Sequence, residues 1–474
     1  MNQHQATYTQ GSIFGHLSLL SMTSAVGLFA IFVVDLVDVF FISILGEATL
    51  AAAVGFAGVA LFIGAAVCIG IAIAVATLVA QALGANDEEQ ARRLSTHGLI
   101  YSLFWTLPVT ALTLYFAPEL LSLIGAEGET LDLAVSYFRI VGASLPVLGF
   151  AMSATAILRS VGDPKRSMWS TLYGGIINAV LDPLFIFGLG WGLNGAAVAS
   201  VISRVTVAGV ALSGLVRQHD MLVKPSLPHF VADIKKLNTI AIPSLITNLS
   251  APVGSAYATA QMARYGTDAV AAASVIGRIT PVAFAGLFGL SGAVGPVASQ
   301  NFGANQLHRV RETLIASLKF TVLYVIPVSI LLFFTQDVLV GIFDLDGEAA
   351  ALLKFYATFI VISYLLYGLQ IAANPIFTSL QHPGLSTVSN MTRDIILTIP
   401  LITLLSGLFG AHGVLAGQAA ANSIAGIAAF AGALWLTRRV EQGLPISFRL
   451  PGRHLLKHCH HHRAIAPGVQ HRGH

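Results

Sequence analysis

Apolar segments long enough to cross a membrane recur along the whole chain. A membrane-spanning helix needs about 20 mainly apolar residues, and these segments lack the period-two alternation of a barrel strand. The sequence therefore predicts an all-α polytopic membrane protein with about twelve transmembrane helices. We expect them over residues 17–45, 49–80, 93–116, 131–158, 166–188, 192–216, 236–262, 268–299, 313–335, 350–378, 386–408 and 412–437.

The composition excludes the main alternatives. Only 10% of the 474 residues are charged and 55% are hydrophobic, whereas average soluble proteins carry roughly 25% charged residues. So little charge excludes a disordered chain and leaves too few polar groups to cover a water-soluble globule. Two cysteines exclude a disulfide scaffold. The net charge of +3 is spread over loops, so we expect no nucleic-acid partner.

Positive charge is concentrated in alternate loops. The positive-inside rule places these loops, and with them both termini, in the cytoplasm. Arg264 is an exception, since it falls among the acidic loops that alternate with the basic ones. The basic loops carry Arg92, Arg93, Arg159, Lys165, Arg166, Arg217, Lys224, Lys235, Lys236, Arg309, Arg311, Arg393, Arg438 and Arg439.

The chain repeats itself at an offset of 219 residues. Residues 79–93 resemble residues 297–311, Pro164 corresponds to Pro383, and Gly195 corresponds to Gly413 at an offset of 218. This predicts two parallel six-helix halves. We expect an N-lobe over 1–216, a cytoplasmic linker over 217–235, a C-lobe over 236–440 and a His-rich tail over 441–474. Such a tail is typical of metal binding or of disorder, and we expect no metal in the mechanism.

Three acids fall inside predicted helices of the first half. Asp35 and Asp38 are three residues apart on one helix, and Asp182 follows Asn178 by four residues on another, so each pair shares a helix face. A carboxyl group in a medium of low dielectric constant takes up a proton more readily than in water. These residues indicate a proton or cation site. Snorkelling to the interface or a structural hydrogen bond between helices is the alternative.

The second half lacks these acids at the matching positions. At the offset of 219, Asp35 corresponds to Gly254, Asp38 to Tyr257 and Asp182 to Leu401. We therefore expect ion coupling in the N-lobe. Further polar or adaptable side chains inside the spans are candidates for substrate binding. They are Met152, Ser153, Ser200, Thr206, Arg278 and Asn374.

These features together resemble the multidrug and toxic compound extrusion (MATE) family. The resemblance covers roughly residues 15–440 and rests on SILGEATLAAAVG (43–55), QALGANDEEQARR (81–93), ILRSVGDPKRSM (157–168), NAVLDPLFIFGLGWGLNGAAVAS (178–200) and ASQNFGANQ (298–306). It implies two six-helix bundles around a V-shaped cleft, and export of organic, often cationic, compounds in exchange for H⁺ or Na⁺. It implies no ATP site, and no P-loop is present.

The resemblance also implies a coupling site in the N-lobe. By motif register the site comprises Asn178, Asp182, Ser200 and an acid of the first helix. Counting forward from LSLL (17–20) selects Asp35, whereas counting back from SILGEATL selects Asp38. Leu20 replaces the family's proline, so a proline bend in the first helix is not expected. The missing acids of the second half favour the DinF-like branch.

These observations predict an H⁺-coupled multidrug antiporter, not an enzyme, in the bacterial inner (plasma) membrane. Its partners would be small-molecule drugs, organic cations and the lipid bilayer, and it would need no cofactor and act as a monomer. Na⁺ as the coupling ion remains an alternative, because Asp, Asn and Ser oxygens also suit Na⁺. A flippase for lipid-linked substrates is another. An intramembrane aspartyl protease is disfavoured, because Asp182 lacks the Gly-x-Gly-Asp context.

Overall fold

The computed structural model describes residues 6–44 and 48–444, without the side chains of residues 35–40, 42–44, 48 and 51. The described residues form helices and connecting loops and contain no strand. The elements are η1 (Thr7–Thr9), α1 (Ile13–Ile44), α2 (Ala48–Gly84), α3 (Glu88–Tyr115), α4 (Ala117–Ile124), α5 (Gly128–Ala143), α6 (Leu145–Val161), α7 (Pro164–Pro183), η2 (Leu184–Gly188), α8 (Gly192–Arg217), α9 (Leu227–Ala263), α10 (Thr267–Ala283), α11 (Ala285–Gly303), α12 (Leu307–Ile342), α13 (Gly347–Phe355), η3 (Tyr356–Ile360), η4 (Val361–Ser363), α14 (Tyr364–Ser379), α15 (Pro383–Met391), η5 (Thr392–Leu397) and α16 (Thr398–Glu441).

Within the described residues, the expected transmembrane helices are all present. Eight helices are long and apolar enough to cross a membrane, or ten if each of two bent helix pairs counts as one span. The span over residues 383–441 contains Gly410 at φ 60° and ψ −140°, where two helices meet. The more polar α9, with 37 residues, completes the set. The prediction of an all-α membrane protein with twelve spans is confirmed.

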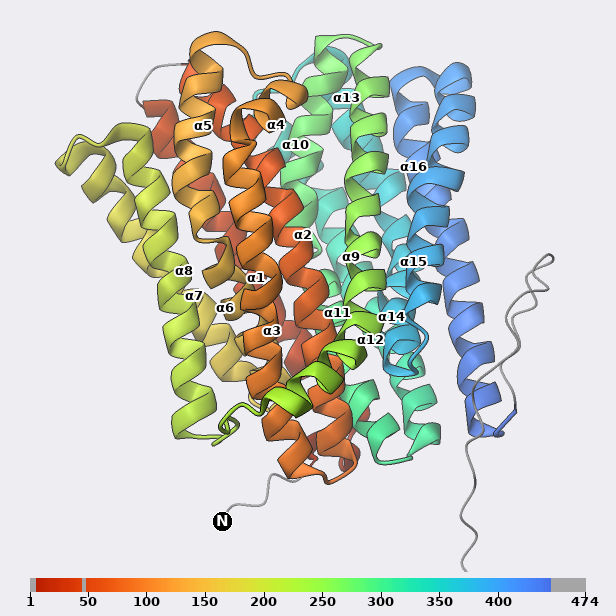
Figure 1. The fold of residues 1–474 in the computed structure, drawn as a ribbon. Coiled ribbons are helices and arrows are strands. Elements are labelled where there is room, and N and C mark those ends of the chain that lie inside the picture. Colours follow the sequence, from red (N-terminus) through yellow and green to blue (C-terminus); the bar gives the residue numbers. More distant parts are fainter. Residues whose placement is uncertain (1–5, 45–47, 445–474) are drawn as a thin grey trace, which may run out of the picture.

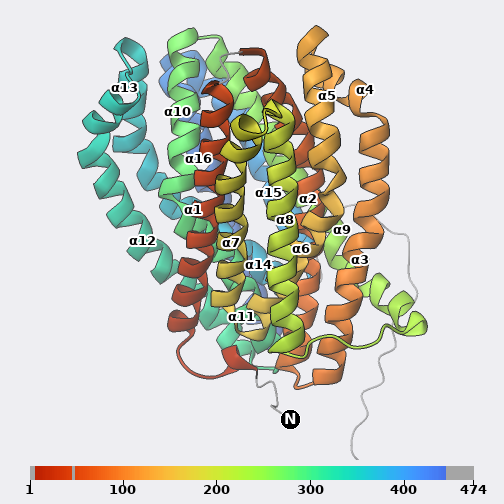
Figure 2. The ribbon, with the colours of Figure 1, turned by 90° about the vertical axis from the view of Figure 1, so that its left-hand side faces the viewer.

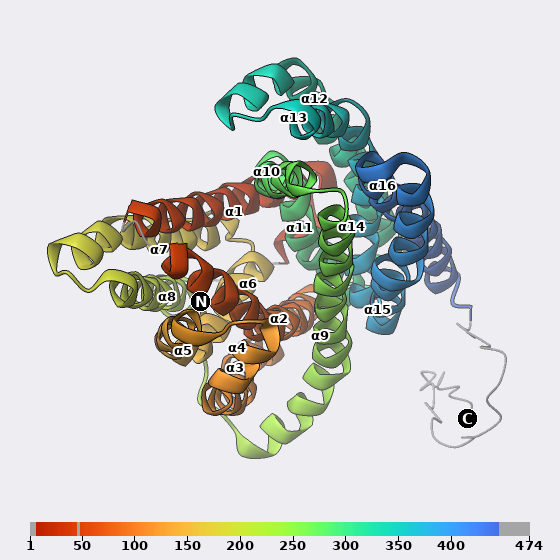
Figure 3. The same cartoon turned by 90° about the horizontal axis from the view of Figure 1, so that it is seen from above.

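The helices form two bundles that lie side by side (Figures 1 and 3). We call α1–α8 the N-lobe and α9–α16 the C-lobe. The end of the molecule with the loops 85–87, 162–163, 218–226, 304–306 and 381–382 is called the basic end; it lies at the bottom of Figure 1. The linker predicted over 217–235 is helical from Leu227, where α9 begins.

The first helix of each half packs partly into the other lobe. Leu17 and Leu20 of α1 are fully buried in the hydrophobic core of the C-lobe, and α1 packs along α11. Leu237 and Ile240 of α9 are buried in the core of the N-lobe, and α9 packs along α2. Between membrane-spanning helices such contacts stabilise the structure through close packing. The two lobes therefore share helices near the basic end instead of meeting at a flat interface.

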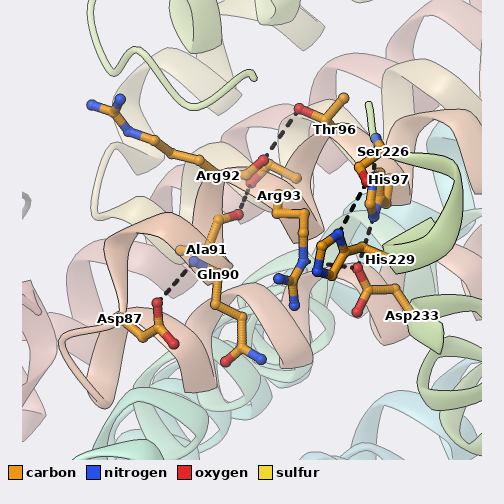
Figure 4. A network of polar contacts seen from close by, with 11 residues as sticks. Asp87, Gln90, Ala91, Arg92, Arg93, Thr96, His97, Ser226, His229 and Asp233 are labelled. Carbon is orange, nitrogen blue, oxygen red and sulfur yellow. Dashed lines mark hydrogen bonds and ion pairs between the residues drawn. The ribbon is translucent and has the colours of Figure 1, made fainter. Parts of the chain in front are cut away.

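The segment that connects the lobes is fastened to α3 (Figure 4). His97 Nδ1 lies 2.7 Å from Asp233 Oδ2, and Arg93 Nε lies 3.2 Å from the same oxygen. The backbone N–H of Ser226 donates to His97 Nε2 at 3.3 Å. Both His97 and Asp233 are buried, so each needs the partners found here. These contacts hold the start of α9 against the N-lobe.

Candidate functional site

The predicted acid of the N-lobe is buried beside a polar amide. Asn178 Nδ2 donates to Asp182 Oδ1 at 3.3 Å, and the side chains are 2% and 0% exposed. Pro183 ends α7 directly after Asp182, and the chain continues as the π-helical turn η2. Because proline interrupts the regular backbone ladder, this stretch suits a polar site inside a membrane. The predicted pairing of Asn178 with Asp182 on one helix face is found in the structure.

The helix that carries the other two predicted acids is a neighbour of α7. Figure 2 shows α1, α7 and α8 side by side, and α7 packs along both of the others. Asp35 and Asp38 belong to α1, but their side chains lie outside the described part of the chain. Ser200 lies half-buried on α8. The helices that carry the predicted coupling residues are therefore adjacent, and the roles of these residues stay predictions.

The predicted substrate-binding residues occupy different environments. The buried hydroxyl of Ser153 has no hydrogen-bond partner in the described residues, and Met152 beside it is half-buried. Thr206 donates to the carbonyl of Ile202 on its own helix at 2.9 Å, which is the usual local bond of a helical threonine. Of these three side chains, only Ser153 has a buried polar atom without a hydrogen-bond partner among the described residues.

Arg278 and Asn374, the two candidates in the C-lobe, lie in different surroundings. Arg278, a predicted substrate-binding residue, is exposed on α10. Asn374 on α14 donates from Nδ2 to Asn390 Oδ1 at 3.0 Å. Asn374 therefore belongs to a polar network inside the C-lobe.

The centre of that network is an ion pair that the sequence analysis missed. Arg393 was placed in a basic loop, and the second half was expected to lack coupling acids in its spans. In the structure Arg393 and Asp394 lie in η5, ten residues into the span that begins at Pro383, and are 8% and 6% exposed. Arg393 Nε donates to Asp394 Oδ1 at 2.7 Å. The span predicted over residues 386–408 contains both residues, but at the offset of 219 Asp394 corresponds to Gly175, so matching the acids of the two halves did not reveal it.

Uncharged groups complete the network around the ion pair. Ser250 Oγ of α9 donates to Asp394 Oδ2 at 2.7 Å. Arg393 Nη1 donates to Gln370 Oε1 at 3.3 Å, and the guanidinium lies 4.9 Å from the centre of the Tyr367 ring. At Gly254, the counterpart of Asp35, an added Cβ would lie 2.9 Å from the carbonyl oxygen of Asp394. The acid of the C-lobe therefore comes from another helix and packs against the position left small in α9.

The two lobes cross at the basic end through a symmetric set of contacts. Gln81 Nε2 of α2 donates to the carbonyl of Ser379 at 2.9 Å, and Gln300 Nε2 of α11 donates to the carbonyl of Ser160 at 2.7 Å. Both donors and both acceptors are related by the offset of 219. An added Cβ on Gly84 would lie 1.9 Å from the carbonyl oxygen of Gln300, and one on Gly303 would lie 2.0 Å from that of Gln81. Only glycine permits this approach.

We call this set of contacts the crossing. A hollow of about 700 Å³ borders it at the basic end, lined mainly by residues 84–86 and 303–306. The segment before α1 joins the lobes at the same place. Tyr8 of η1 donates from its backbone N–H to Gln300 Oε1 at 2.8 Å and from its hydroxyl to the carbonyl of Arg159 at 2.7 Å. Burial raises the pKa of the Tyr8 hydroxyl, so it stays a donor at neutral pH.

Comparisons with known proteins agree with this architecture. The MatE family profile matches residues 24–184 and 243–404, one block in each lobe. An FAD transporter of Shewanella oneidensis is 30% identical over 417 residues, which cover 87% of this chain and 92% of that protein. The multidrug export protein MepA of Staphylococcus aureus is 24% identical, over 90% of this chain and 95% of that protein.

Solved structures show the same fold. A multidrug resistance MATE transporter of the MOP superfamily in an outward-facing conformation superimposes with a TM-score of 0.86 at 22% identity, covering 93% of this chain and 99% of that chain. A MOP superfamily transporter from Pyrococcus furiosus, described by the reversed polarity of its binding pocket, gives 0.85 at 22% identity, with the same coverage. The chain therefore belongs to the MATE family, whose members are transporters and not enzymes.

Proposed function

We propose that this protein exports organic cations across the bacterial inner membrane in exchange for protons. The observation that carries the proposal is the buried Asp182 carboxyl beside the neutral amide of Asn178. A buried acid inside a membrane is costly and therefore marks a functional position by default. When ionised, it attracts a cation; when protonated, it loses that attraction. One carboxyl group can therefore bind a proton and a cationic drug in turn.

The crossing supplies the conformational element that such an exchange needs. It closes the basic end, which the positive-inside rule places in the cytoplasm, so drug and proton would enter and leave from the opposite side in this state. The crossing consists of neutral hydrogen bonds and glycine contacts. Transport requires that drug and proton favour different states of the crossing. The multidrug export protein MepA, similar over 90% of this chain, supports drugs as substrates.

The test uses proteoliposomes that contain the full chain and a fluorescent organic cation. We expect efflux driven by a pH gradient, and no efflux driven by a Na⁺ gradient alone. Asp182→Asn should lower the rate by about tenfold or more, as expected when a coupling free energy is lost. Asp132→Asn is the matched control, because Asp132 is an exposed acid of the same lobe. Full pH-driven efflux by Asp182→Asn would refute the coupling role of Asp182. Efflux driven by a Na⁺ gradient alone would show that Na⁺, and not H⁺, is the coupling ion.

FAD is the second candidate substrate. The relative that is 30% identical over 417 residues is an FAD transporter, and Arg278 is an exposed cation on α10 that can meet a phosphate group. The same vesicles loaded with FAD give the comparison. Efflux of FAD without efflux of the organic cation would replace the first substrate class by the second.

A further inference from the structure

A cavity of about 300 Å³ lies in the C-lobe, among α9, α10, η3, α14 and the second half of α16. Its volume is at the lower end of the roughly 300–1,000 Å³ typical of ligand pockets. Among the described residues no charged side chain lines it. The polar groups that line it include Thr280, Tyr356, Ser363, Tyr364, Gln418 and Asn422. The cavity belongs neither to the Asp182 site nor to the ion pair of Arg393.

The duplication of the chain identifies the N-lobe residues that correspond to the lining of this cavity. An added Cβ on Gly214 of α8 would contact Leu158, and one on Gly432 of α16 would contact Phe377. Leu158 and Phe377 are 219 apart, and the two glycines are 218 apart, like Gly195 and Gly413. The offset of 218 therefore holds over this whole stretch of α8 and α16. It makes Asn422 the counterpart of Arg204.

The regular α-helix is interrupted at corresponding places of the two lobes, and we call each interruption the bend. In the N-lobe two helices meet there at an angle, whereas the C-lobe stretch Gly347–Ser379 passes through η3 and η4 as one span. In the N-lobe, Ser144 Oγ donates to the carbonyl of Val141 at 2.7 Å, where α5 meets α6 at an angle of 44°. In the C-lobe, Ser363 Oγ donates to the carbonyl of Ile360 at 2.6 Å, where η3 and η4 precede α14. Both residues of the pair are again 219 apart. The two lobes thus offer the same carbonyl and the same hydroxyl at the bend.

The lobes fill the space at the bend differently. Arg204 Nη1 donates to the carbonyl of Val141 at 3.0 Å and to Ser144 Oγ at 2.8 Å. In the C-lobe the counterparts of all three residues, namely Ile360, Ser363 and Asn422, line the cavity. Asparagine is too short to reach across as arginine does. The cavity therefore lies where the N-lobe holds a guanidinium group.

The free polar groups of the cavity suit a donor from outside the chain. Gln418 and Asn422 are four apart on α16 and share a helix face. Neither amide forms a hydrogen bond to another described residue, so both carbonyl oxygens remain as acceptors. Tyr356 and Tyr364 also line the cavity, and one face of the Tyr364 ring is stacked on Phe284.

We propose that this cavity binds a planar cation with N–H donors, of the guanidinium or amidinium class, in the place that Arg204 fills in the N-lobe. The ligand would donate to the bend at Ile360 and Ser363 and to the amides of Gln418 and Asn422. The proposal rests on the export of organic cations proposed above, and it adds a substrate class and a second binding site to that function. The proposed cavity site would distinguish cations by their N–H donors, whereas a buried acid attracts every cation.

The test measures binding to the full-length protein in nanodiscs, without an ion gradient, by equilibrium dialysis. Benzamidine is the probe, and benzyltrimethylammonium is the control, because it keeps the ring and the charge but has no N–H donor. We expect benzamidine to bind about tenfold more tightly, the ratio expected from one to two hydrogen bonds. Asn422→Arg should abolish the preference, since its own guanidinium would fill the cavity as Arg204 does.

Two further variants keep the test decisive. Asn422→Leu should weaken benzamidine binding about threefold to tenfold, even if the arginine variant fails to fold. Ser423→Ala is the control, because Ser423 bonds to Ala419 on its own helix, and it should bind like the natural sequence. Equal affinity for the two probes, or benzamidine binding unchanged by both Asn422 substitutions, would overturn the proposal. If benzamidine is still preferred but the protein shows no pH-driven efflux, proton-coupled export would be refuted and the binding site in the C-lobe would stand.

Discussion

The two lobes share one scaffold but carry their buried charge in different ways. In the N-lobe, Asp182 lies beside the neutral amide of Asn178. In the C-lobe, Asp394 lies 2.7 Å from the guanidinium nitrogen of Arg393, which also stacks on Tyr367. The acids come from α7 and η5, which are corresponding helices of the repeat, but from different positions along them. The repeat therefore preserved the backbone and changed where the charge lies.

This difference suits the N-lobe acid to exchange of protons and cations, and the C-lobe ion pair to stabilisation of the fold. A buried ion pair hydrogen-bonded on both sides has its charge neutralised locally, and breaking it leaves an uncompensated charge in the lobe. A carboxyl group beside an amide has a partner that serves both its ionised and its protonated form. The comparison predicts that the C-lobe pair stabilises the fold and that the N-lobe acid drives transport. Three further experiments compare the two lobes at the ion pair, at the crossing and at a helix start.

The largest expected effect is at the ion pair. Arg393→Met should lower the free energy of unfolding by about 3–5 kcal/mol, because Asp394 would remain buried without its cation. The double variant Arg393→Met/Asp394→Asn should recover most of that loss, since the amide still accepts from Ser250 Oγ. Thermal unfolding in detergent measures both. If the single and double variants are equally unstable, the pair is not the source of the stability.

Substitutions on the two sides of the crossing should have equal effects, whereas substitutions at the charged sites of the two lobes should not. Gly84→Ala and Gly303→Ala each place a Cβ about 2 Å from a carbonyl oxygen of the other lobe, a strain of roughly 1–3 kcal/mol. Each should shift the protein toward a state open at the basic end. Spin labels on cysteines at Glu89 and His308, which are exposed and 219 apart, report the separation in a background without Cys68 and Cys459.

The control for the crossing is Gly209→Ala, because an added Cβ there meets no atom within 4 Å. It should leave the distance between the labels unchanged. A response to only one of the two crossing variants would show that the crossing is not functionally symmetric.

The smallest effect concerns a helix start and depends on pH. The pKa of Asp163 is lowered by a hydrogen bond from His219, by the backbone N–H of Arg166 and by the Arg166 charge. A lowered pKa in the folded state gives stability that is present above the unfolded value of about 3.9 and is lost as the pH falls through the folded value. Asp163→Asn should therefore lower stability by at most about 1 kcal/mol at pH 7, and by less near pH 3.

The C-lobe provides the comparison for Asp163. His382 precedes α15 as Asp163 precedes α7, but its side chain does not cap the helix. His382→Asn should not lose stability with the acid-dependent profile expected of Asp163→Asn. Melting temperatures at pH 7 and near pH 3 measure both. The same acid dependence for both variants would contradict the role of the Asp163 carboxylate.

Much of the fold was predictable from the sequence because hydrocarbon leaves few choices. Apolar runs of about 20 residues must be helical to satisfy their backbone groups, and the repeated Gly-Ala-Asn segments at 84–86 and 303–305 indicated the duplication. The pairing of Asn178 with Asp182 followed from their spacing on one helix. The exposed position of Arg278 did not follow, because helical spacing alone does not say which face of α10 is buried.

The sequence by itself determined the twelve helices, their duplication and one buried acid, since each depends on residues close together in the chain. Only the tertiary structure decided that Arg393 neutralises Asp394, that Gly84 and Gly303 let the lobes touch, and that Asn422 leaves open the space filled by Arg204. Each of these depends on atoms of different helices, often more than 100 residues apart, being brought within a few ångströms. The physical reason is that charge compensation and close packing are properties of neighbours in space.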